Sequence, residues 1–140
     1  MRTALCLALL IALGLPLASS AGPPDESDGD DIPDVLDKCT IDSRNAVATC
    51  DSDSDGYGNP CDPDFNQDNA VTSADFGMLF VPAFKGSDPA PWPQGMDMNC
   101  DGSVTSADFG MFFVPKFKGG LGGAKPGPSG LACAGVPGCQ

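Results

Sequence analysis

A segment of 23 residues occurs twice in this chain, at residues 64–86 and 97–119, and it restricts the possible folds more than any other feature. Seventeen of the 23 positions are identical in the two copies. Each copy begins with acidic and amide residues at alternate positions and continues with a stretch rich in phenylalanine. The repetition predicts two copies of one structural unit, a polar loop followed by an apolar helix.

The first twelve residues of each copy have the spacing of a calcium-binding loop, with oxygen ligands at places 1, 3, 5, 7, 9 and 12. In loop 4 (residues 97–108) these are Asp97, Asn99, Asp101, the backbone carbonyl of Ser103, Thr105 or a water molecule, and Asp108. In loop 3 (residues 64–75) they are Asp64, Asn66, Asp68, the carbonyl of Ala70, and Asp75, which like Asp108 replaces the usual Glu. Calcium is predicted because it accepts six to eight oxygen ligands in loose geometry.

The twelfth-place residues have an alternative role as helix caps. Thr72 and Asp75, like Thr105 and Asp108, have the spacing of a capping box, and a carboxylate in the first turn suits the helix dipole. Asp, Asn, Gly and Ser also form ordinary turns. Because both copies carry three further oxygen residues upstream in register, we favour calcium ligation.

Apolar residues after each loop recur at intervals of three and four, which predicts one apolar face on each helix. They are Phe76, Leu79 and Phe80 in the first copy and Phe109, Phe112 and Phe113 in the second. We expect these residues to form the core between the helices rather than a ligand-binding surface. Gly77 and Gly110 recur at one helical position, which predicts close contact between the helices.

Prolines divide the rest of the repeat region. Pro82 and Pro115 disfavour helical geometry at the preceding valines, so each helix is expected to end or kink after about two turns. Phe84 and Phe117 would then fold back over the core. Between the repeats, three prolines around Trp92 predict an extended connector whose Trp92 covers the core, with sugar stacking as the alternative. After Lys118 a Gly- and Pro-rich stretch predicts a flexible linker.

Two further acidic loops precede the repeats. The ligand places of loop 1 (residues 26–37) hold Glu26, Asp28, Asp30, Ile32 through its carbonyl, Asp34 and Asp37. Those of loop 2 (residues 51–62) hold Asp51, Asp53, Asp55, Tyr57 through its carbonyl, Asn59 and Asp62. Neither loop is followed by a helical pattern, so metal and disulfides are expected to hold this half of the chain.

The first 21 residues predict a secretory signal peptide, with a basic residue at Arg2, an apolar run at 4–17 and small residues at 18–21. A membrane anchor is the alternative, but a spanning helix needs about 20 apolar residues. No membrane span is therefore expected in the mature chain. Secretion to an extracellular or periplasmic location is expected, and Cys6 would be removed with the signal.

Six cysteines remain after residue 21: Cys39, Cys50, Cys61, Cys100, Cys133 and Cys139. An even number in a small exported chain predicts a disulfide framework. A zinc site is the alternative, but the chain has no histidine and no cysteine pair with two-residue spacing. Cys133 and Cys139 could close a local ring, or one of them could reach Cys100.

Six basic residues face nineteen acidic ones in the mature chain, and fifteen of the acidic residues occupy ligand places of the four loops. Bound cations would reduce the repulsion of so acidic a chain. No basic patch is available to neutralise phosphates, so nucleic acid is not an expected partner. No catalytic constellation is visible either, since histidine and a phosphate-binding glycine loop are absent and the carboxylates are spaced for chelation. We expect no enzymatic activity.

Two known families resemble parts of this chain. SDGDDIPDVLDKC and CDSDSDGYGNPCDPD resemble thrombospondin type 3 repeats, which implies Asp-rich loops that wrap calcium ions, with disulfides between neighbouring loops. The paired DxNxD(N/G)xVTSAD strings and the phenylalanine-rich segments after them resemble a type I dockerin. That resemblance implies two loop–helix units of EF-hand type around a pseudo-twofold axis, and a cohesin partner in assemblies that degrade polysaccharides.

The expected fold is small, loop-rich and mainly α, with tandem Asp-rich calcium loops followed by two dockerin-like, EF-hand-type units. The expected divisions are a signal peptide at 1–21, a thrombospondin type 3-like segment at 22–62, a dockerin-like domain at 63–119, and a cysteine-containing Gly/Pro-rich tail at 120–140. The expected function is that of a secreted, non-catalytic calcium-binding module for structure, adhesion or docking. Its partners would be calcium ions and a cohesin-like or cell-envelope protein.

Overall fold

The computed structural model describes residues 24–44, 50–119 and 124–140, so the predicted signal peptide lies outside the described residues. Two short 3-10 helices, η1 (Asp34–Leu36) and η2 (Asn59–Cys61), belong to the acidic first half. Two longer helical segments follow, η3 (Asp75–Phe80) with α2 (Val81–Phe84) and η4 (Asp108–Phe113) with α3 (Val114–Phe117). The described residues form a small, loop-rich chain without strands, as expected, in which each longer helix follows an Asp-initiated loop.

Both longer helices continue through their prolines. Of the two predicted alternatives, an end or a kink at the proline, the end is therefore wrong. Val81 has φ −62° and ψ −43°, and Val114 has φ −60° and ψ −44°, which are helical values. The preceding segments η3 and η4 are π-helical, and the N–H of Val81 donates to the carbonyl of Phe76, five residues earlier. Each proline therefore lies in the first turn of a new α-helical segment, where its missing N–H costs little.

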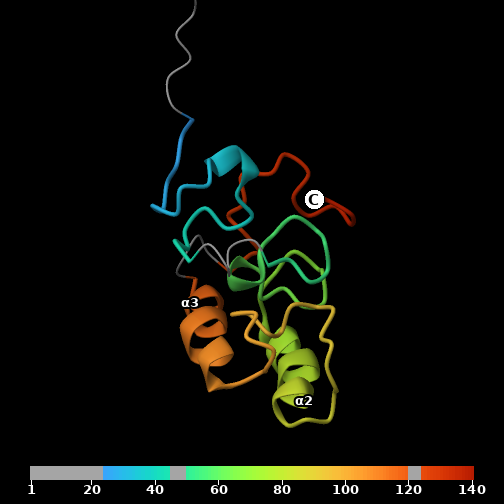
Figure 1. Cartoon of the computed structure of the whole chain (residues 1–140). Helices are drawn as coiled ribbons and strands as arrows, with labels where there is room; N and C mark the ends of the chain where they lie inside the picture. Colours follow the sequence, from blue (N-terminus) through green and yellow to red (C-terminus); the bar gives the residue numbers. More distant parts are fainter. Residues whose placement is uncertain (1–23, 45–49, 120–123) are drawn as a thin grey trace, which may run out of the picture.

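The two helices lie side by side at one end of the molecule and enclose the core (Figure 1). The buried core residues are Phe65, Val71, Phe80, Ala83, Met96, Met98, Phe112 and Phe113, with Phe76, Leu79, Trp92, Val104 and Phe109 packed against them. Phenylalanine pairs dominate this cluster, and the Phe76 and Phe109 ring centroids lie 5.0 Å apart. The predicted aromatic core is confirmed, and Trp92 covers it as expected.

Two predicted details of the repeats differ from the structure. Phe84 and Phe117 do not fold back over the core, because they lie on the continuing helices, where they stack on Phe80 and Phe113 one turn earlier and about half of each remains exposed. Gly77 does not mark a helix contact, nor does its equivalent Gly110, because a Cβ at either position would meet nothing within 4 Å. Both glycines face open space on the outer side of their helices, so the prediction of close helix packing there is wrong.

Three disulfides join all six cysteines that follow the predicted signal peptide. Cys39 pairs with Cys61, Cys50 with Cys100, and Cys133 with Cys139. The framework prediction is confirmed, and the local ring at 133–139 is the alternative that the structure adopts. Because no free thiol remains among these six, they cannot form the alternative zinc site. Three disulfides fit an oxidising compartment, such as an extracellular or periplasmic one.

The tail folds back over the acidic half of the chain, so the flexible-linker prediction is wrong for residues 124–130 (Figure 1). The Ser129 hydroxyl donates to the Gly56 carbonyl at 2.7 Å, and the Gly130 N–H donates to the Asp37 carbonyl at 2.9 Å. A Cβ at Gly130 would overlap the Asp34 carbonyl, so only glycine permits this approach. Glycine and proline here serve close packing rather than flexibility.

A buried lysine attaches the same tail to the second helix. Lys116 is fully buried, and its Nζ donates to the backbone carbonyls of Lys125 and Gly127. Burial lowers the pKa of Lys116 to about 8, although the nearby Asp62 carboxylate acts in the opposite direction. In the first repeat the equivalent position is Ala83, a core residue without such a contact.

None of the helices in the described ranges is long and apolar enough to cross a membrane.

Substitution of the central core residue Phe113 tests this packing. Phe113 is 2% exposed and stacks on four other phenylalanines besides Phe117, so Phe113→Ala should lower the free energy of unfolding by about 3 to 5 kcal/mol through loss of contacts and a residual cavity. The measurement is urea unfolding followed by circular dichroism, in the presence of calcium. Met111→Ala, on the outer side of the same helix, is the control and should change stability by less than about 0.5 kcal/mol. Equal effects of the two substitutions would contradict this core.

Candidate metal centre

Loops 3 and 4 have nearly the same hydrogen-bond network; in loop 4 the Met98 N–H additionally donates to Asp108 at 2.9 Å. The first-place carboxylate accepts the N–H groups of the fifth and sixth places: Asp64 from Asp68 and Asn69 at 3.0 and 2.6 Å, and Asp97 from Asp101 and Gly102 at 3.1 and 2.8 Å. The third-place Asn amide donates to the fifth-place carboxylate at 2.9 Å in both loops. These bonds turn the oxygen-bearing side chains toward the inside of each loop.

The twelfth-place carboxylates close these two loops and also cap the helices. Asp75 and Asp108 are fully buried. One oxygen of Asp75 accepts the Asn66 N–H at 3.3 Å, and the other accepts the Thr72 N–H at 2.7 Å; Asp108 repeats both contacts with Asn99 and Thr105. The capping role is therefore confirmed, and it places the twelfth-place carboxylate against the third place of its own loop.

All four loops share one backbone shape, including the first, whose sequence departs most from the formula. Positive φ occurs at the fourth and sixth places of every loop: Gly29 and Asp31, Ser54 and Gly56, Gln67 and Asn69, and Cys100 and Gly102. In each loop the seventh-place N–H donates to the fifth-place carboxylate, from Ile32, Tyr57, Ala70 and Ser103 in turn. Asp31, which stands where Gly is usual, adopts φ 68° without losing this geometry.

Loop 1 contains carboxylate oxygens that have no hydrogen-bond partner within the described residues. Oxygens of Glu26, Asp28 and Asp30 lie within 4.8 Å of one another. Both oxygens of Asp28 and one each of Asp30 and Asp37 are buried and unpartnered. Asp30 and Asp37 are only 3% and 2% exposed. Buried charges without partners are costly, so these oxygens fit a cation held inside the loop.

Loop 2 gathers oxygens of Asp51, Asp53 and Asp55 within 4.8 Å, which makes it a second acidic cluster that could hold a metal ion. Asp51 also forms an ion pair with Lys38 at 2.9 Å. Asp62, at the twelfth place, is buried and accepts the Asp64 N–H at 3.3 Å. Sequence reasoning missed Lys38, since nothing in its spacing relates it to loop 2.

The ninth place differs among the loops. In loop 1 the Asp34 carboxylate accepts the N–H and hydroxyl of Ser27 at 2.8 and 2.7 Å. In loop 2 the Asn59 side chain bonds to Ser52 of its own loop and donates to the Asp97 carbonyl of loop 4 at 2.9 Å. Asn59 is therefore placed at the junction of loops 2 and 4 rather than among the acidic side chains. The ninth-place Thr72 and Thr105 hydroxyls face the carboxylates of Asp75 and Asp108.

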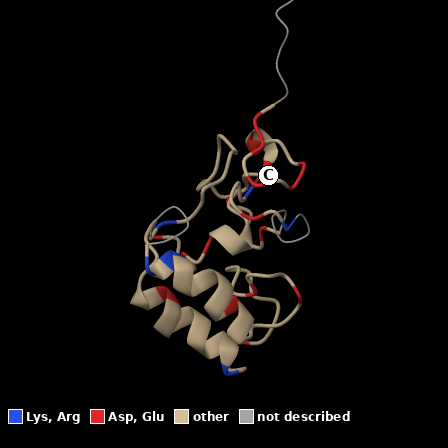
Figure 2. Ribbon diagram, turned by 90° about the vertical axis from the view of Figure 1, so that its left-hand side faces the viewer, with Lys and Arg blue, Asp and Glu red and all other residues tan. Residues whose placement is uncertain are grey.

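Burial and repulsion between neighbouring carboxylates raise the pKa values of several acidic residues in the loops. Burial, then the charges of Asp30 and Asp37, raises the pKa of Asp28 to about 6. Burial, then the charges of Asp55 and Asp51, raises the pKa of Asp53 to about 7. Burial also raises the pKa values of Asp64 and Asp97 above the ordinary value. Figure 2 shows that acidic residues dominate the loops and that basic ones are few. Protons, or a metal ion, relieve this repulsion.

The raised pKa values predict different pH dependences with and without metal. In calcium-free buffer the folded chain holds protons that the unfolded chain, with Asp pKa values near 3.8, has released. The free energy of unfolding should therefore fall as the pH rises from about 5 to about 7.5. With saturating calcium it should change little over the same range, because the ligands are deprotonated both in the calcium-bound folded chain and in the unfolded chain. Urea unfolding at both pH values measures this, and metal-free protein that gains stability with pH would contradict it.

Comparisons with known proteins were made for the whole chain. No family model, no curated protein and no solved structure matches it. The oxygen-lined loops, the three disulfides and the two helices are therefore the basis on which a function can be assigned. Their chemistry is that of acidic clusters that could bind a metal ion in an oxidising environment.

Proposed function

We propose that the chain is a secreted, non-catalytic calcium-binding module whose fold is stabilised by the ions. The observation that carries this proposal is the shared geometry of the four loops, each with inward-turned oxygens and the same pair of positive-φ places. The buried, unpartnered oxygens of loop 1 add an independent reason, because they lack the partner that a cation would supply.

Calcium suits these loops better than the other common cations. The proposed ligands are all oxygens, in clusters of three or more carboxylates and amides with backbone carbonyls between them. Magnesium prefers a strict octahedron and retains several waters, whereas calcium accepts more ligands in looser geometry. Zinc and copper favour nitrogen and sulfur, but the chain has no histidine, and its described cysteines are in disulfides. We propose that about two to four ions bind.

The proposed role of calcium is structural. Among the residues that the structure describes, loops 1 and 2 have no aromatic core of their own, and the buried apolar cluster near them is the Cys39–Cys61 disulfide. Their carboxylates are held by backbone N–H groups of their own loops, so they are arranged to surround an ion rather than to flank a substrate bond. Because each site requires a folded loop, the free energy of calcium binding adds to the stability of the fold.

Calcium removal and readdition test this proposal. Added calcium should raise the melting temperature of chelator-treated protein, since one site at 100 times its Kd contributes about 2.7 kcal/mol. Far-UV circular dichroism measures the transition, and native mass spectrometry counts the ions. Asp30→Asn should remove one ion because Asp30 carries an unpartnered buried oxygen, whereas the control Asp88→Asn, outside all four loops, should retain the full number. An unchanged melting temperature at millimolar calcium would refute the proposal.

A second candidate function is docking, in line with the dockerin resemblance of residues 64–119. Two apolar grooves of about 380 and 410 Å³ lie along the helix pair. The first groove is lined by Phe76, Phe80, Val81, Phe84, Lys85, Ser106 and Phe109. The second is lined by the equivalent residues with the two repeats interchanged, namely Phe109, Phe113, Val114, Phe117, Lys118, Ser73 and Phe76. The two repeats thus present equivalent grooves, each with one lysine at its rim.

The chemistry of the grooves favours one kind of partner, a protein surface with apolar side chains and acidic neighbours. Phe84 and Phe117 are half exposed in the grooves, whereas Phe80, Phe112 and Phe113 of the same helices are buried. Lys85 and Lys118 are exposed basic residues in a strongly acidic chain. A cohesin-like module is the candidate that the resemblance supplies, with a cell-envelope protein as the alternative.

Binding of purified cohesin modules from the same organism tests docking. The intact protein should be captured at micromolar concentrations, and a Phe84→Ser, Phe117→Ser double variant should not be, because both grooves lose an aromatic wall. The control is Met78→Ser with Met111→Ser, which changes exposed residues on the outer sides of the helices. Equal capture of the two double variants would contradict docking through these grooves.

A further inference from the structure

Loop 2 contacts loop 3 through a residue that is not itself a proposed ligand. The amide nitrogen of Gln67 donates to the Asp53 carboxylate of loop 2 at 2.7 Å. The same nitrogen lies 3.4 Å from the carbonyl of Asp64, the first residue of loop 3. One side chain thus connects a proposed ligand of loop 2 to the start of loop 3.

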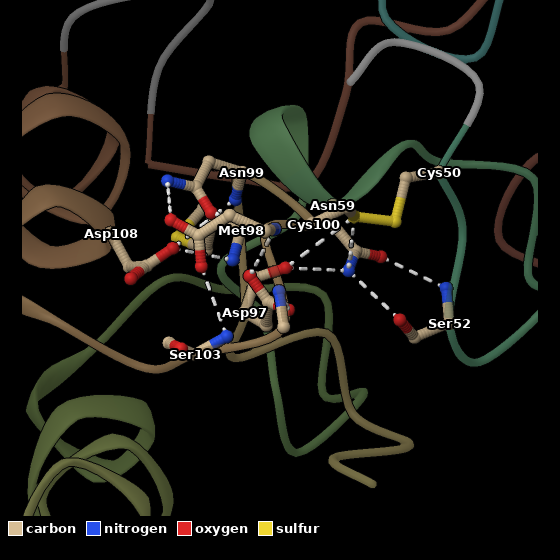
Figure 3. Close-up of a disulfide and its surroundings, with 11 residues drawn as sticks. Cys50, Ser52, Asn59, Asp97, Met98, Asn99, Cys100, Ser103 and Asp108 are labelled. Carbon is tan, nitrogen blue, oxygen red and sulfur yellow. Dashed lines mark hydrogen bonds between the residues drawn. A yellow bond between two sulfur atoms is a disulfide. The ribbon is translucent and has the colours of Figure 1, made fainter. Parts of the chain in front are cut away.

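Loop 2 contacts loop 4 through a different side chain. Asn59 is 3% exposed, and its amide nitrogen donates to the Asp97 carbonyl at 2.9 Å and to the Ser52 hydroxyl at 2.8 Å. Its amide oxygen accepts the Ser52 N–H at 2.9 Å. Figure 3 shows these bonds beside the Cys50–Cys100 disulfide, whose Cα atoms lie 6.5 Å apart. Through Asn59, hydrogen bonds therefore connect the start of loop 2 to the start of loop 4, because Ser52 directly follows Asp51 and Asp97 is the first residue of loop 4.

At these two junctions the repeats use equivalent residues, Gln67 in one and the disulfide-bonded Cys100 in the other. Gln67 and Cys100 both occupy the fourth place, with φ of 60° and 54°, and this place has no ligand role in the loop formula. It is one of only six places at which the repeats differ. The fourth-place residue of the first repeat, Gln67, bonds to Asp53 of loop 2, and that of the second repeat, Cys100, forms a disulfide with Cys50, the residue immediately before loop 2.

We propose that loop 2 couples calcium binding in loops 3 and 4, with Gln67 and Asn59 as positioning residues. The proposal rests on the calcium-binding function proposed above and concerns how its sites communicate. Asp53, held by an ion in loop 2, would position Gln67 against loop 3. The Asp51–Ser52 segment, ordered by the same ion, would position Asn59 against Asp97 of loop 4. Each neighbouring loop is then already ordered when its own ion arrives, so its ion binds more tightly.

Site-resolved calcium titration tests the coupling in the full chain. The backbone N–H groups of Gly56, Asn69 and Gly102 each donate to the first carboxylate of their own loop, at 3.1, 2.6 and 2.8 Å. Their amide signals in ¹H–¹⁵N NMR spectra therefore report on loops 2, 3 and 4 separately. In the native protein the three titration midpoints should coincide.

Two substitutions should separate these midpoints in opposite ways. Gln67→Met keeps the size of the side chain but removes the donor, so it should raise the Asn69 midpoint roughly three- to tenfold and leave the Gly102 midpoint unchanged. Asn59→Ser should raise the Gly102 midpoint and leave the Asn69 midpoint unchanged. A merely destabilising substitution would shift all three together. Met78→Gln, on the exposed helix surface, is the control and should shift none.

Asp53→Asn is a further test that leaves the buried residue Asn59 unchanged, so its result does not depend on whether Asn59 can be substituted. It weakens loop 2 while keeping an oxygen for Gln67, and it should raise the midpoints of Asn69 and Gly102 as well as that of Gly56. If it raises only the Gly56 midpoint, the coupling is wrong and the calcium-binding proposal stands. If none of the three native amides responds to millimolar calcium, the calcium-binding proposal itself is wrong.

Discussion

Repulsion between buried carboxylates is the constraint on which the rest of this structure depends. Fifteen of nineteen acidic residues occupy the ligand places of four loops. Backbone N–H groups stabilise part of this charge, but burial, together with a smaller contribution from neighbouring carboxylates, raises the pKa values of Asp28 and Asp53. The disulfides, the Lys38–Asp51 ion pair and the tail hold the loops in place against the repulsion. A bound cation would convert the same repulsion into attraction.

The differences between the two repeats have a structural meaning, because several occur where a repeat contacts the rest of the chain. Gln67 and Cys100 connect to loop 2. Phe112, in place of Leu79, has the Arg44 guanidinium over its ring at 4.3 Å. Lys116 binds the tail. The residues that are identical in the two repeats form the loop, the helix cap and the core. Several of the residues that differ form contacts with parts of the chain outside the repeats, which are not themselves repeated.

Periodic features of the sequence were predictable, and non-periodic ones were not. The alternating oxygens, the helix starts and the aromatic face follow from residue spacing, and the structure shows the loops, caps and core at those positions. The continuation of the helices through Pro82 and Pro115 was missed because a π-helical turn shifts the hydrogen-bond register ahead of each proline. The packing of residues 124–130 against the acidic half was missed because a glycine-rich stretch is found both in flexible linkers and where two segments of backbone come into close contact. Asn59 was assigned to loop 2 from spacing alone, which carries no information about a contact 38 residues away.

The attachment of the tail affects when the acidic half can complete its fold. Ser129 bonds to residues 73 and 92 positions earlier, at Gly56 and Asp37, and the Gly135 and Gly138 N–H groups donate to carbonyls within loop 2. Contacts so distant in sequence form slowly and only after the later residues have been synthesised. Loops 1 and 2 therefore reach their final form after residue 138 has emerged, whereas the helix pair can pack earlier.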